Sequence, residues 1–347
     1  MTLASSSSDR WSIVRGLFEA VSALADAQRK SFLDFACPDH GIRHEVESML
    51  QADRAAAEWQ MPGDRASTQA VETLPEIPGY RIDREIGVGG AGSVYLATSN
   101  GGRRVAIKVV RSVGSSQQAV QRFRQECRAL ARLNHDGIVQ LVETGTAPGG
   151  LVYLVMEFVH GLSLDAWMSE EQPTIDRCVQ LTLRVLDALA HAHDAGVIHR
   201  DIKPHNVVVT PEGQPKLVDF GVARLIGDEG RRTGFRTETG HLVGTFAYMS
   251  PEQADGRSER IGTASDVYQC ALLLFEMIAG RLPYDTDGRS AAGLLRAVLM
   301  DRRMRLDAIR SDAPSALVEL LDRALSIEVE RRPSTVRAFA AELAAIA

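Results

Sequence analysis

Apolar and polar residues follow different rhythms along the chain, and the changes between them divide it into three segments. In residues 9–57, apolar residues recur at spacings of three and four, which predicts two or three short amphipathic helices. This periodicity fades across residues 58–79, where proline and glycine accumulate as they do in linkers. From Tyr80 onward, apolar residues recur at even spacing, which predicts β-strands. We therefore expect a helical N-terminal extension at residues 1–57, a linker, and a larger unit at residues 80–345.

The larger unit begins with strands and continues with helices. Its apolar runs predict five strands, of which the first two flank a glycine-rich turn, and one helix among them. The expected ranges are 80–96 for the first two strands, then 105–110, 138–143 and 152–158, with the helix at 118–134. Further helices are expected at 164–170, at 175–195 and, strongly apolar, from Asp266 to residue 279. The fold class is therefore α+β, with a five-stranded lobe followed by a mainly helical lobe.

Two polar stretches, at residues 199–206 and 219–221, place reactive side chains beside short apolar runs. Loops between strands would hold them there. Phosphoryl transfer requires a positioned acceptor hydroxyl and neutralisation of charge by a metal ion. Asp201 is expected to orient the hydroxyl, and Asn206 and Asp219 are expected to hold Mg²⁺. That ion prefers oxygen ligands and usually takes one or two carboxylates from the protein.

Two lysines complete this set. Lys203, two residues beyond Asp201, can reach the transferred phosphate as a point charge. Lys108 lies inside an otherwise apolar strand, where a lysine is costly to bury unless it is paired and hydrogen-bonded. Glu126, on the helix expected at residues 118–134, is its predicted partner. Lys108 would then be positioned to hold the α and β phosphates of a nucleotide.

The glycine-rich turn is the expected phosphate cradle. Glycine lets backbone N–H groups approach phosphate oxygens without obstruction by Cβ, although the pattern alone also fits a plain turn. A strand follows it, and not the helix of a dinucleotide fold, which counts against NAD or FAD binding. A second group of contacts is expected around adenine, where the first lobe ends. The candidate nucleotide-binding residues are Ile86, Gly87, Val88, Gly89, Gly90, Ala91, Gly92, Ser93, Val94, Ala106, Lys108, Glu126, Met156, Glu157 and Val159.

Composition narrows the class of protein further. Of the 347 residues, 45% are hydrophobic and 24% are charged, which is typical of a globular protein. The formal net charge is −6, and residues 1–78 carry −5 of it, so no basic footprint for nucleic acid is present. The four cysteines form no CxxC pair, which favours a reducing cytoplasm over a disulfide framework. Neither a signal peptide nor an apolar run long enough to span a membrane is expected.

In their order along the chain, these motifs resemble the protein kinase superfamily, specifically the bacterial kinases similar to eukaryotic serine/threonine kinases (Hanks-type). The resemblance covers residues 80–345. It rests on the turn at residues 87–94, VAIK ending at Lys108, Glu126, HRDIKPHN, DFG, SPE and Arg332. The resemblance implies a bilobal protein kinase fold with ATP between the lobes, and Lys203 with Thr245 is the pattern of serine/threonine specificity. Ala91 and Ser250 depart from the usual residues without removing a catalytic group.

The segment between Asp219 and Glu252 is long and polar, and such loops in compact domains are usually functional. Thr237 and Thr239 are candidate autophosphorylation sites, because a phosphothreonine there could pair with Arg200. The alternative is that these threonines are simply solvated. Three residues have expected structural roles. Phe220 belongs to the DFG sequence, and Arg332 is the expected ion-pair partner of Glu252. Asp266 would hold the backbone of the catalytic loop, residues 199–206.

The predicted function is that of a serine/threonine protein kinase that uses ATP with Mg²⁺, or Mn²⁺ as an alternative, on protein substrates. A homodimer that autophosphorylates in trans is one option for its assembly, and no motif fixes the oligomeric state. One alternative is a pseudokinase scaffold, which has no need of Lys108, Asp201, Asn206 and Asp219 together. Another is a small-molecule kinase of related fold, which would lack the long segment after Asp219.

The N-terminal extension carries no catalytic constellation. His40 and His44 lie four residues apart, but no third ligand of matching spacing accompanies them, so surface histidines are the preferred interpretation. The amphipathic stripe and acidic charge of the extension predict a role in docking or regulation. The physiological substrate and the activating stimulus are not encoded in any motif of the chain.

Overall fold

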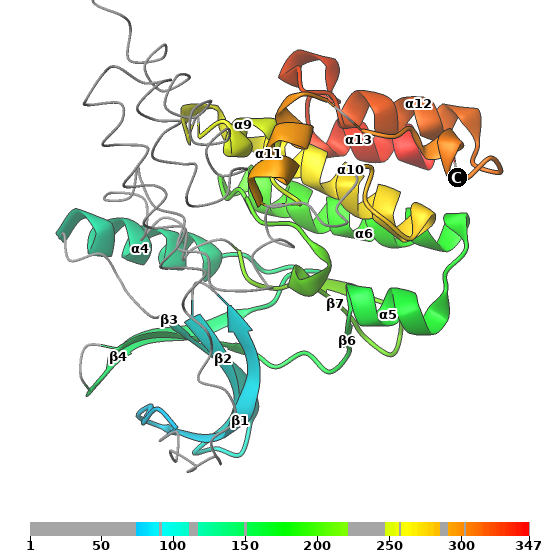
Figure 1. Ribbon diagram of the computed structural model, residues 1–347. Coiled ribbons are helices and arrows are strands. Elements are labelled where there is room, and N and C mark those ends of the chain that lie inside the picture. The colour runs from blue at the N-terminus through cyan, green and yellow to red at the C-terminus, as the bar shows by residue number, and fades with distance from the viewer. Residues whose placement is uncertain are drawn as a thin grey trace, which may run out of the picture. The chain divides into compact units, whose positions relative to one another are not determined.

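The computed structural model describes residues 74–89, 92–110, 117–148, 151–220, 247–256, 258–284, 291–301 and 303–346. Contacts divide the chain into two units, Met1–Thr73 and Leu74–Ala347. The predicted N-terminal helices and most of the predicted linker lie outside the described residues. Every element described below belongs to the second unit (Figure 1).

A five-stranded antiparallel sheet forms the first part of this unit, in the order β1-β2-β3-β5-β4. Its strands are β1 (Tyr80–Gly89), β2 (Gly92–Ser99), β3 (Arg104–Val110), β4 (Leu141–Ala147) and β5 (Leu151–Glu157), and one helix, α4 (Gln117–Leu130), accompanies them (Figure 1). The number of strands and the single helix confirm the predicted α+β class. Helix α4 ends four residues before the expected position 134, where a turn takes over.

Side chains of the central strand β3 alternate between two apolar clusters. Val105, Ile107 and Val109 are buried on one face with Ile77, which precedes the first strand. Because successive side chains point to opposite faces of a sheet, Lys108 lies on the other face. This alternation turns the one charged residue of the buried part of the strand toward the rest of the unit.

The strand β4 begins at Leu141, three residues later than expected. Ile138 instead forms a parallel bridge with Leu217, and the amide of Val139 donates a hydrogen bond to the Leu217 carbonyl at 3.0 Å. Leu217 belongs to a small second sheet in the order β6-β7-β8, formed by β6 (Leu162–Ser163), β7 (Val207–Val209) and β8 (Pro215–Leu217). The predicted start was wrong because Ile138 and Val139 are paired with this distant strand.

The remainder of the unit is helical, as predicted. Its helices are α5 (Leu164–Glu171), α6 (Ile175–Asp194), α9 (Pro251–Ala254), α10 (Thr263–Ala279), α11 (Ala291–Leu299), α12 (Ser315–Ala324) and α13 (Val336–Ala344), with short 3-10 turns η2 (Pro204–Asn206), η3 (Ser258–Arg260), η4 (Leu306–Ala308) and η5 (Val329–Arg331). Helix α10 begins at Thr263, three residues before the expected Asp266. It ends at Ala279 and is followed by Gly280, whose φ of 70° is the left-handed conformation that glycine adopts at little cost.

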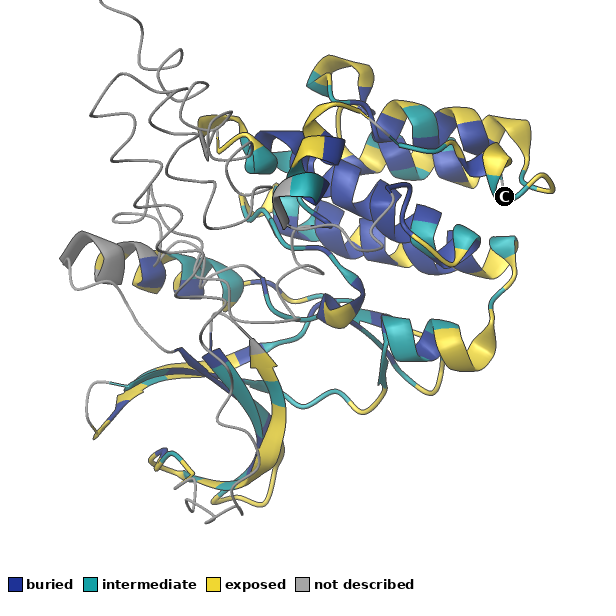
Figure 2. Cartoon of the chain, viewed as in Figure 1, coloured by how far each residue is buried: buried dark blue, intermediate teal, exposed yellow. Residues whose placement is uncertain are grey.

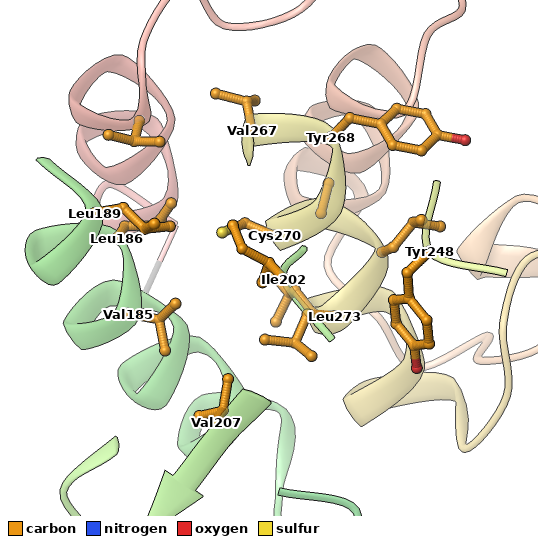
Figure 3. Packing of buried hydrophobic residues seen from close by; sticks show 14 of the residues in the cluster. Val185, Leu186, Leu189, Ile202, Val207, Tyr248, Val267, Tyr268, Cys270 and Leu273 are labelled. Carbon is orange, nitrogen blue, oxygen red and sulfur yellow. The ribbon is translucent and has the colours of Figure 1, made fainter. Parts of the chain in front are cut away.

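Helix α10 is the centre of the helical part. Thirteen of its seventeen residues are buried, and it appears dark blue around most of its surface in Figure 2. A helix that is apolar on nearly all sides must be surrounded by other elements. Figure 3 shows Leu186 and Leu189 of α6 facing Val267 and Cys270 of α10, with Ile202 in the same packed layer. The catalytic-loop residue Ile202 is therefore anchored in the core.

Among the described residues, no helix combines the length and the apolar character needed to cross a lipid bilayer.

Candidate active site

The residues expected to carry the chemistry come together in the loop that joins α6 to β7. Asn206 donates from Nδ2 to the Asp201 carbonyl at 2.7 Å and to Asp201 Oδ2 at 3.1 Å. Lys203 Nζ lies 3.0 Å from the same Asp201 Oδ2. The carboxylate of Asp201 is thus fixed between an amide and an ammonium group, with its side chain 14% exposed.

The backbone of this loop is held by Asp266, which is fully buried on α10. Its Oδ2 accepts the His199 amide at 2.9 Å, and its Oδ1 accepts the Arg200 amide at 2.8 Å. His193 Nε2 donates to Oδ2 as well, at 2.7 Å. Arg200 has a φ of 66°, a left-handed conformation that side chains other than glycine adopt only when their surroundings hold them there. Asp266 supplies part of that constraint.

Lys108 pairs with Asp219 in this structure, and not with the predicted Glu126. Its Nζ contacts Asp219 Oδ1, and only 8% of its side chain is exposed. Glu126 Oε1 lies instead 3.7 Å from Arg200 Nη1. Burial raises the pKa of Glu126, and the Arg200 charge partly opposes this shift. In this structure α4 directs Glu126 toward Arg200 of the catalytic loop, and Asp219 is the carboxylate that meets Lys108.

Phe220 follows Asp219 and is buried against the catalytic loop. Its ring centroid lies 4.5 Å from that of His199, at an interplanar angle of 39°. Complete burial lowers the pKa of His199, although the neighbouring carboxylates of Asp266 and Asp201 oppose this shift. A lowered pKa favours the neutral imidazole, which packs against the Phe220 ring and accepts the Asp201 amide at Nδ1 at 3.3 Å.

Asn206 and Asp219 present the oxygen ligands that a magnesium ion prefers. Because Asn206 Nδ2 is engaged by Asp201, its amide oxygen is left as the acceptor. The Asn206 carbonyl accepts the Val218 amide at 2.9 Å, which fixes the loop beside Asp219. No group of three His, Cys, Asp or Glu side chains suited to a metal occurs in the part of the chain that the structure describes. A metal held here would take its other ligands from phosphate and water, as Mg²⁺ usually does.

The expected phosphate cradle lies between β1 and β2. Gly87 pairs with Val94, Val88 with Ser93, and Gly89 with Gly92 across this hairpin. A side chain at Gly92 would be impossible, since a Cβ there would lie 1.9 Å from the Val109 carbonyl oxygen. The side chains before the turn are open to solvent, with Ile86 37% and Val88 59% exposed. The tip of the hairpin, Gly90 and Ala91, lies outside the described residues.

The residues expected around adenine lie on neighbouring strands. Ala106 of β3 is paired with Met156 of β5, and Glu157 and Val159 continue from there. Met156 also lines a mainly apolar cavity that reaches Lys108, Asp219 and Phe220, bounded by Val110, Leu130, Ile138, Val139, Leu141, Leu154 and Leu217. Of the residues expected around adenine, Ala106 and Met156 therefore share one face of the sheet with Lys108, whereas Glu157 is paired with Val105.

Glu157 is also part of a junction that the sequence did not reveal. Lys216 of β8 donates to Glu157 Oε1 at 2.7 Å, and the Gln140 amide donates to the same oxygen at 3.2 Å. The Glu157 amide returns a hydrogen bond to the Gln140 carbonyl at 3.0 Å. Because Asp219 follows β8 by two residues, this junction connects Glu157, expected near adenine, to the strand that leads to Asp219, expected to hold the metal. The available signal was a lysine in a short apolar run, the same signal that identified Lys108.

Glu252 and Arg332 form a buried ion pair below the site. Arg332 Nη1 and Nη2 donate to Glu252 Oε1 and Oε2, each at 2.9 Å, and Ser265 Oγ donates to Oε1 at 2.6 Å. Burial favours the neutral form of Glu252, but these hydrogen bonds and the Arg332 charge prevail and lower its pKa. Ser265 was not anticipated. The expected roles of Thr237, Thr239 and Thr245 fall on residues that the structure does not describe.

Comparisons with known proteins give a consistent result. The family described as "Protein kinase domain" matches residues 80–343. The serine/threonine-protein kinase Pkn3 of Myxococcus xanthus is 37% identical over 278 residues, which are 77% of this chain and 50% of Pkn3. The serine/threonine-protein kinase PknA of Mycobacterium tuberculosis is 40% identical over 223 residues, 60% of this chain and 48% of PknA. The chain thus spans about half the length of these curated relatives.

The family match extends over the sheet, the catalytic loop and the helical part, so it covers every element that contributes to the site. The named relatives are bacterial kinases of the kind that the motifs resemble. The chain belongs to the protein kinase family, among the bacterial Hanks-type serine/threonine kinases.

Proposed function

We propose that this protein is a serine/threonine protein kinase that transfers the γ-phosphate of ATP to hydroxyl groups of protein substrates. The observation that carries the proposal is a chain of contacts: Asn206 bonds to Asp201, the Asn206 carbonyl accepts the amide of Val218, next to Asp219, and Asp219 pairs with Lys108. Membership in the protein kinase family supports the use of ATP with a divalent metal ion and action on proteins. The names of the relatives support serine and threonine as acceptors.

The roles of the residues follow from their contacts. Asp201, fixed by Asn206 and Lys203, would accept a hydrogen bond from the substrate hydroxyl and orient its oxygen toward the phosphate. Lys203 would remain beside the transferred group as a positive charge. Asn206 and Asp219 would hold Mg²⁺, which supplies neutralisation of phosphate charge when it is bound. The hairpin at Gly87–Val94 would cover the phosphates with backbone amides.

We further propose that the arrangement around Glu126 changes when the kinase is activated. In this structure Glu126 lies near Arg200, and Lys108 forms an ion pair with Asp219. A phosphothreonine at position 237 or 239 would attract Arg200 and release Glu126 to pair with Lys108. Asp219 would then be available to the metal. Autophosphorylation in trans within a homodimer is the proposed source of that phosphate.

The remaining proposals concern the whole protein. A cytoplasmic location, protein partners and no nucleic-acid partner are supported by the acidic balance and the cysteine pattern. The N-terminal extension is proposed to dock a substrate or to regulate the kinase. A pseudokinase scaffold is disfavoured, because a scaffold has no use for the hydrogen bonds that fix Asp201.

Incubation of the purified protein with labelled ATP and either Mg²⁺ or Mn²⁺ tests the activity. We expect label on the protein and on added substrate protein, at a level reduced by about 10³-fold or more in Asp201→Asn, because the hydroxyl loses its orienting carboxylate. Equal labelling of both proteins would refute a kinase mechanism that depends on Asp201. Mapping the labelled residues by mass spectrometry decides between Thr237, Thr239 and neither.

A further inference from the structure

The peptide groups on both sides of the catalytic Asp201 are fixed by side chains of α10. Asp266 accepts the amides of His199 and Arg200, which precede Asp201. The amide of Ile202, which follows it, donates to Gln269 Oε1 at 3.0 Å. Residues three apart on a helix share a face, so Asp266 and Gln269 reach the loop side by side. Asp201 therefore lies between two points that α10 holds.

Gln269 uses its amide nitrogen as well as its oxygen. Nε2 lies 3.3 Å from the Arg200 carbonyl and 3.2 Å from the Tyr248 carbonyl, and both oxygens accept from it. Gln253 Oε1 lies 3.0 Å away as a third acceptor, so the two amide hydrogens are shared among three oxygens. Gln253 in turn donates to the Arg200 carbonyl at 2.7 Å. The side chain of Gln269 thus links the catalytic loop to Tyr248, near the end of the segment between Asp219 and Glu252.

The carbonyl that these two glutamines share belongs to the left-handed residue. Arg200 has a φ of 66°, which is unfavourable for a residue with a Cβ unless its peptide groups are held. Its amide is held by Asp266, and its carbonyl is held by Gln253 and Gln269. Releasing the carbonyl would let the peptide between Arg200 and Asp201 rotate, and Asp201 would move with it.

We propose that Gln269 is a positioning residue for phosphoryl transfer. It holds the backbone of Arg200–Ile202 in a fixed position relative to the backbone of Tyr248. The side chain is 1% exposed, and its hydrogen bonds go to the backbone of Arg200, Ile202 and Tyr248 and to Gln253, so it would act through the position of Asp201. This inference rests on the proposed kinase activity. It adds to that activity a residue that neither the motifs nor the comparisons single out.

The first test compares Gln269→Leu with Thr182→Val. Thr182 is a buried residue of α6 whose hydroxyl donates to the Cys178 carbonyl at 2.8 Å, remote in its bonding from the catalytic loop. Both variants lose buried hydrogen bonds, so both are expected to have a lower Tm. We expect only Gln269→Leu to lose kcat, by about 10- to 100-fold, since a shift of about 1 Å in a catalytic group has an effect of that size. Its KM for ATP should change by less than about threefold.

The second test uses Gln269→Glu, which keeps the side-chain shape if the leucine variant does not fold. A carboxylate at this position would face the carbonyl oxygens of Arg200 and Tyr248, whereas a protonated carboxyl group could donate to one of them as the amide does. The ratio of its kcat to that of the wild type should therefore rise as the pH falls from about 9 to about 6. Charged and titratable groups on the elements packed here are Asp266, Cys270, Glu276, His193, His199, Arg200, Asp201, Lys203, Tyr248 and Glu252. Burial raises the pKa of Glu276 to about 7, inside this pH range. Dividing by the wild-type value removes the titration that both proteins share.

The outcomes separate the two proposals. A wild-type protein without transferase activity refutes the proposed function. An active wild type with unchanged kcat in Gln269→Leu, or an activity ratio for Gln269→Glu that does not vary with pH, overturns the role of Gln269 alone. A loss of kcat in Thr182→Val as large as that in Gln269→Leu also overturns it, because stability would then explain both.

Discussion

Glu252 and Arg332 are separated by 80 positions, yet their side chains are 3% and 0% exposed. Removing two charges from water costs several kcal/mol for each, and the attraction between them offsets this cost only when the geometry is good and the remaining donors are satisfied. Both conditions hold here, because Arg332 also donates to the Ser326 and Ala264 carbonyls at 2.8 and 3.0 Å. The pair is therefore sensitive to the loss of either partner.

Replacement of Arg332 by leucine should lower the free energy of unfolding by about 3–5 kcal/mol, because Glu252 would remain buried without a counter-ion. Denaturant unfolding followed by fluorescence measures this change. The matched control is Arg331→Leu. Arg331 is its neighbour, 68% exposed, and lies 3.9 Å from Glu328, so the control should change stability by less than about 0.5 kcal/mol. Equal effects of the two variants would contradict the buried-pair argument.

The pair also gives stability a defined pH dependence. The pKa of Glu252 is lower in the folded protein than its ordinary value of 4.5. A carboxyl group of this kind contributes its full stability above the unfolded pKa, and that contribution is lost as the pH falls through the folded pKa. The wild type should therefore lose stability below about pH 4.5 relative to Arg332→Leu, in which the buried carboxyl group prefers to be protonated.

The ends of the helices and strands show which parts of the structure can be predicted from the local spacing of apolar residues. The extents of α5, α6 and β5 follow from the spacing of apolar residues, because each buries a face that its own sequence defines. The beginning of β4 does not, since Ile138 before it is paired with Leu217 of β8, 79 positions away. Local pattern and distant pairing therefore fix different boundaries of the same sheet.

The candidate site divides in the same way. A lysine in an apolar strand predicts that Lys108 needs a carboxylate, but Glu126 and Asp219 both satisfy that need, and only the position of α4 decides between them. Gln269 gave no signal at all, because one polar residue in an apolar helix resembles any helix position that touches solvent. Its hydrogen bonds join segments that no local pattern relates.

The position of α4 leads to a prediction about turnover. When a metal ion takes the Asp219 carboxylate, Lys108 requires another partner, and Glu126 is the carboxylate on the adjacent helix. Glu126→Gln should therefore lower kcat/KM for ATP by about 10²-fold. Arg124→Gln, on an exposed position of the same helix, is the control and should have little effect. Full activity of Glu126→Gln would mean that Glu126 stays near Arg200 during turnover.

At the scale of the molecule, the second unit includes residues before its first strand. Ile77 is 4% exposed, packs with Val105, Ile107 and Val109 against the sheet, and forms a bridge to Tyr80. The last residues of the predicted linker therefore belong structurally to the sheet. Because Ile77 packs against the sheet, removing the N-terminal segment can affect stability as well as regulation. Truncations that keep or remove Ile77 separate these two effects.

Two truncations distinguish these effects. Deletion of residues 1–73 leaves Ile77 in place, so the Tm of the remaining unit should stay within about 2 °C of the full chain. Deletion of residues 1–79 uncovers the apolar cluster and should lower stability by about 2–5 kcal/mol, and Ile77→Ala in the full chain should reproduce part of this loss. Differential scanning calorimetry measures both.

If deletion of residues 1–73 changes substrate capture or autophosphorylation while the Tm is unchanged, the extension acts in docking or regulation. If activity, oligomeric state and substrate capture are all unaffected, that role is refuted.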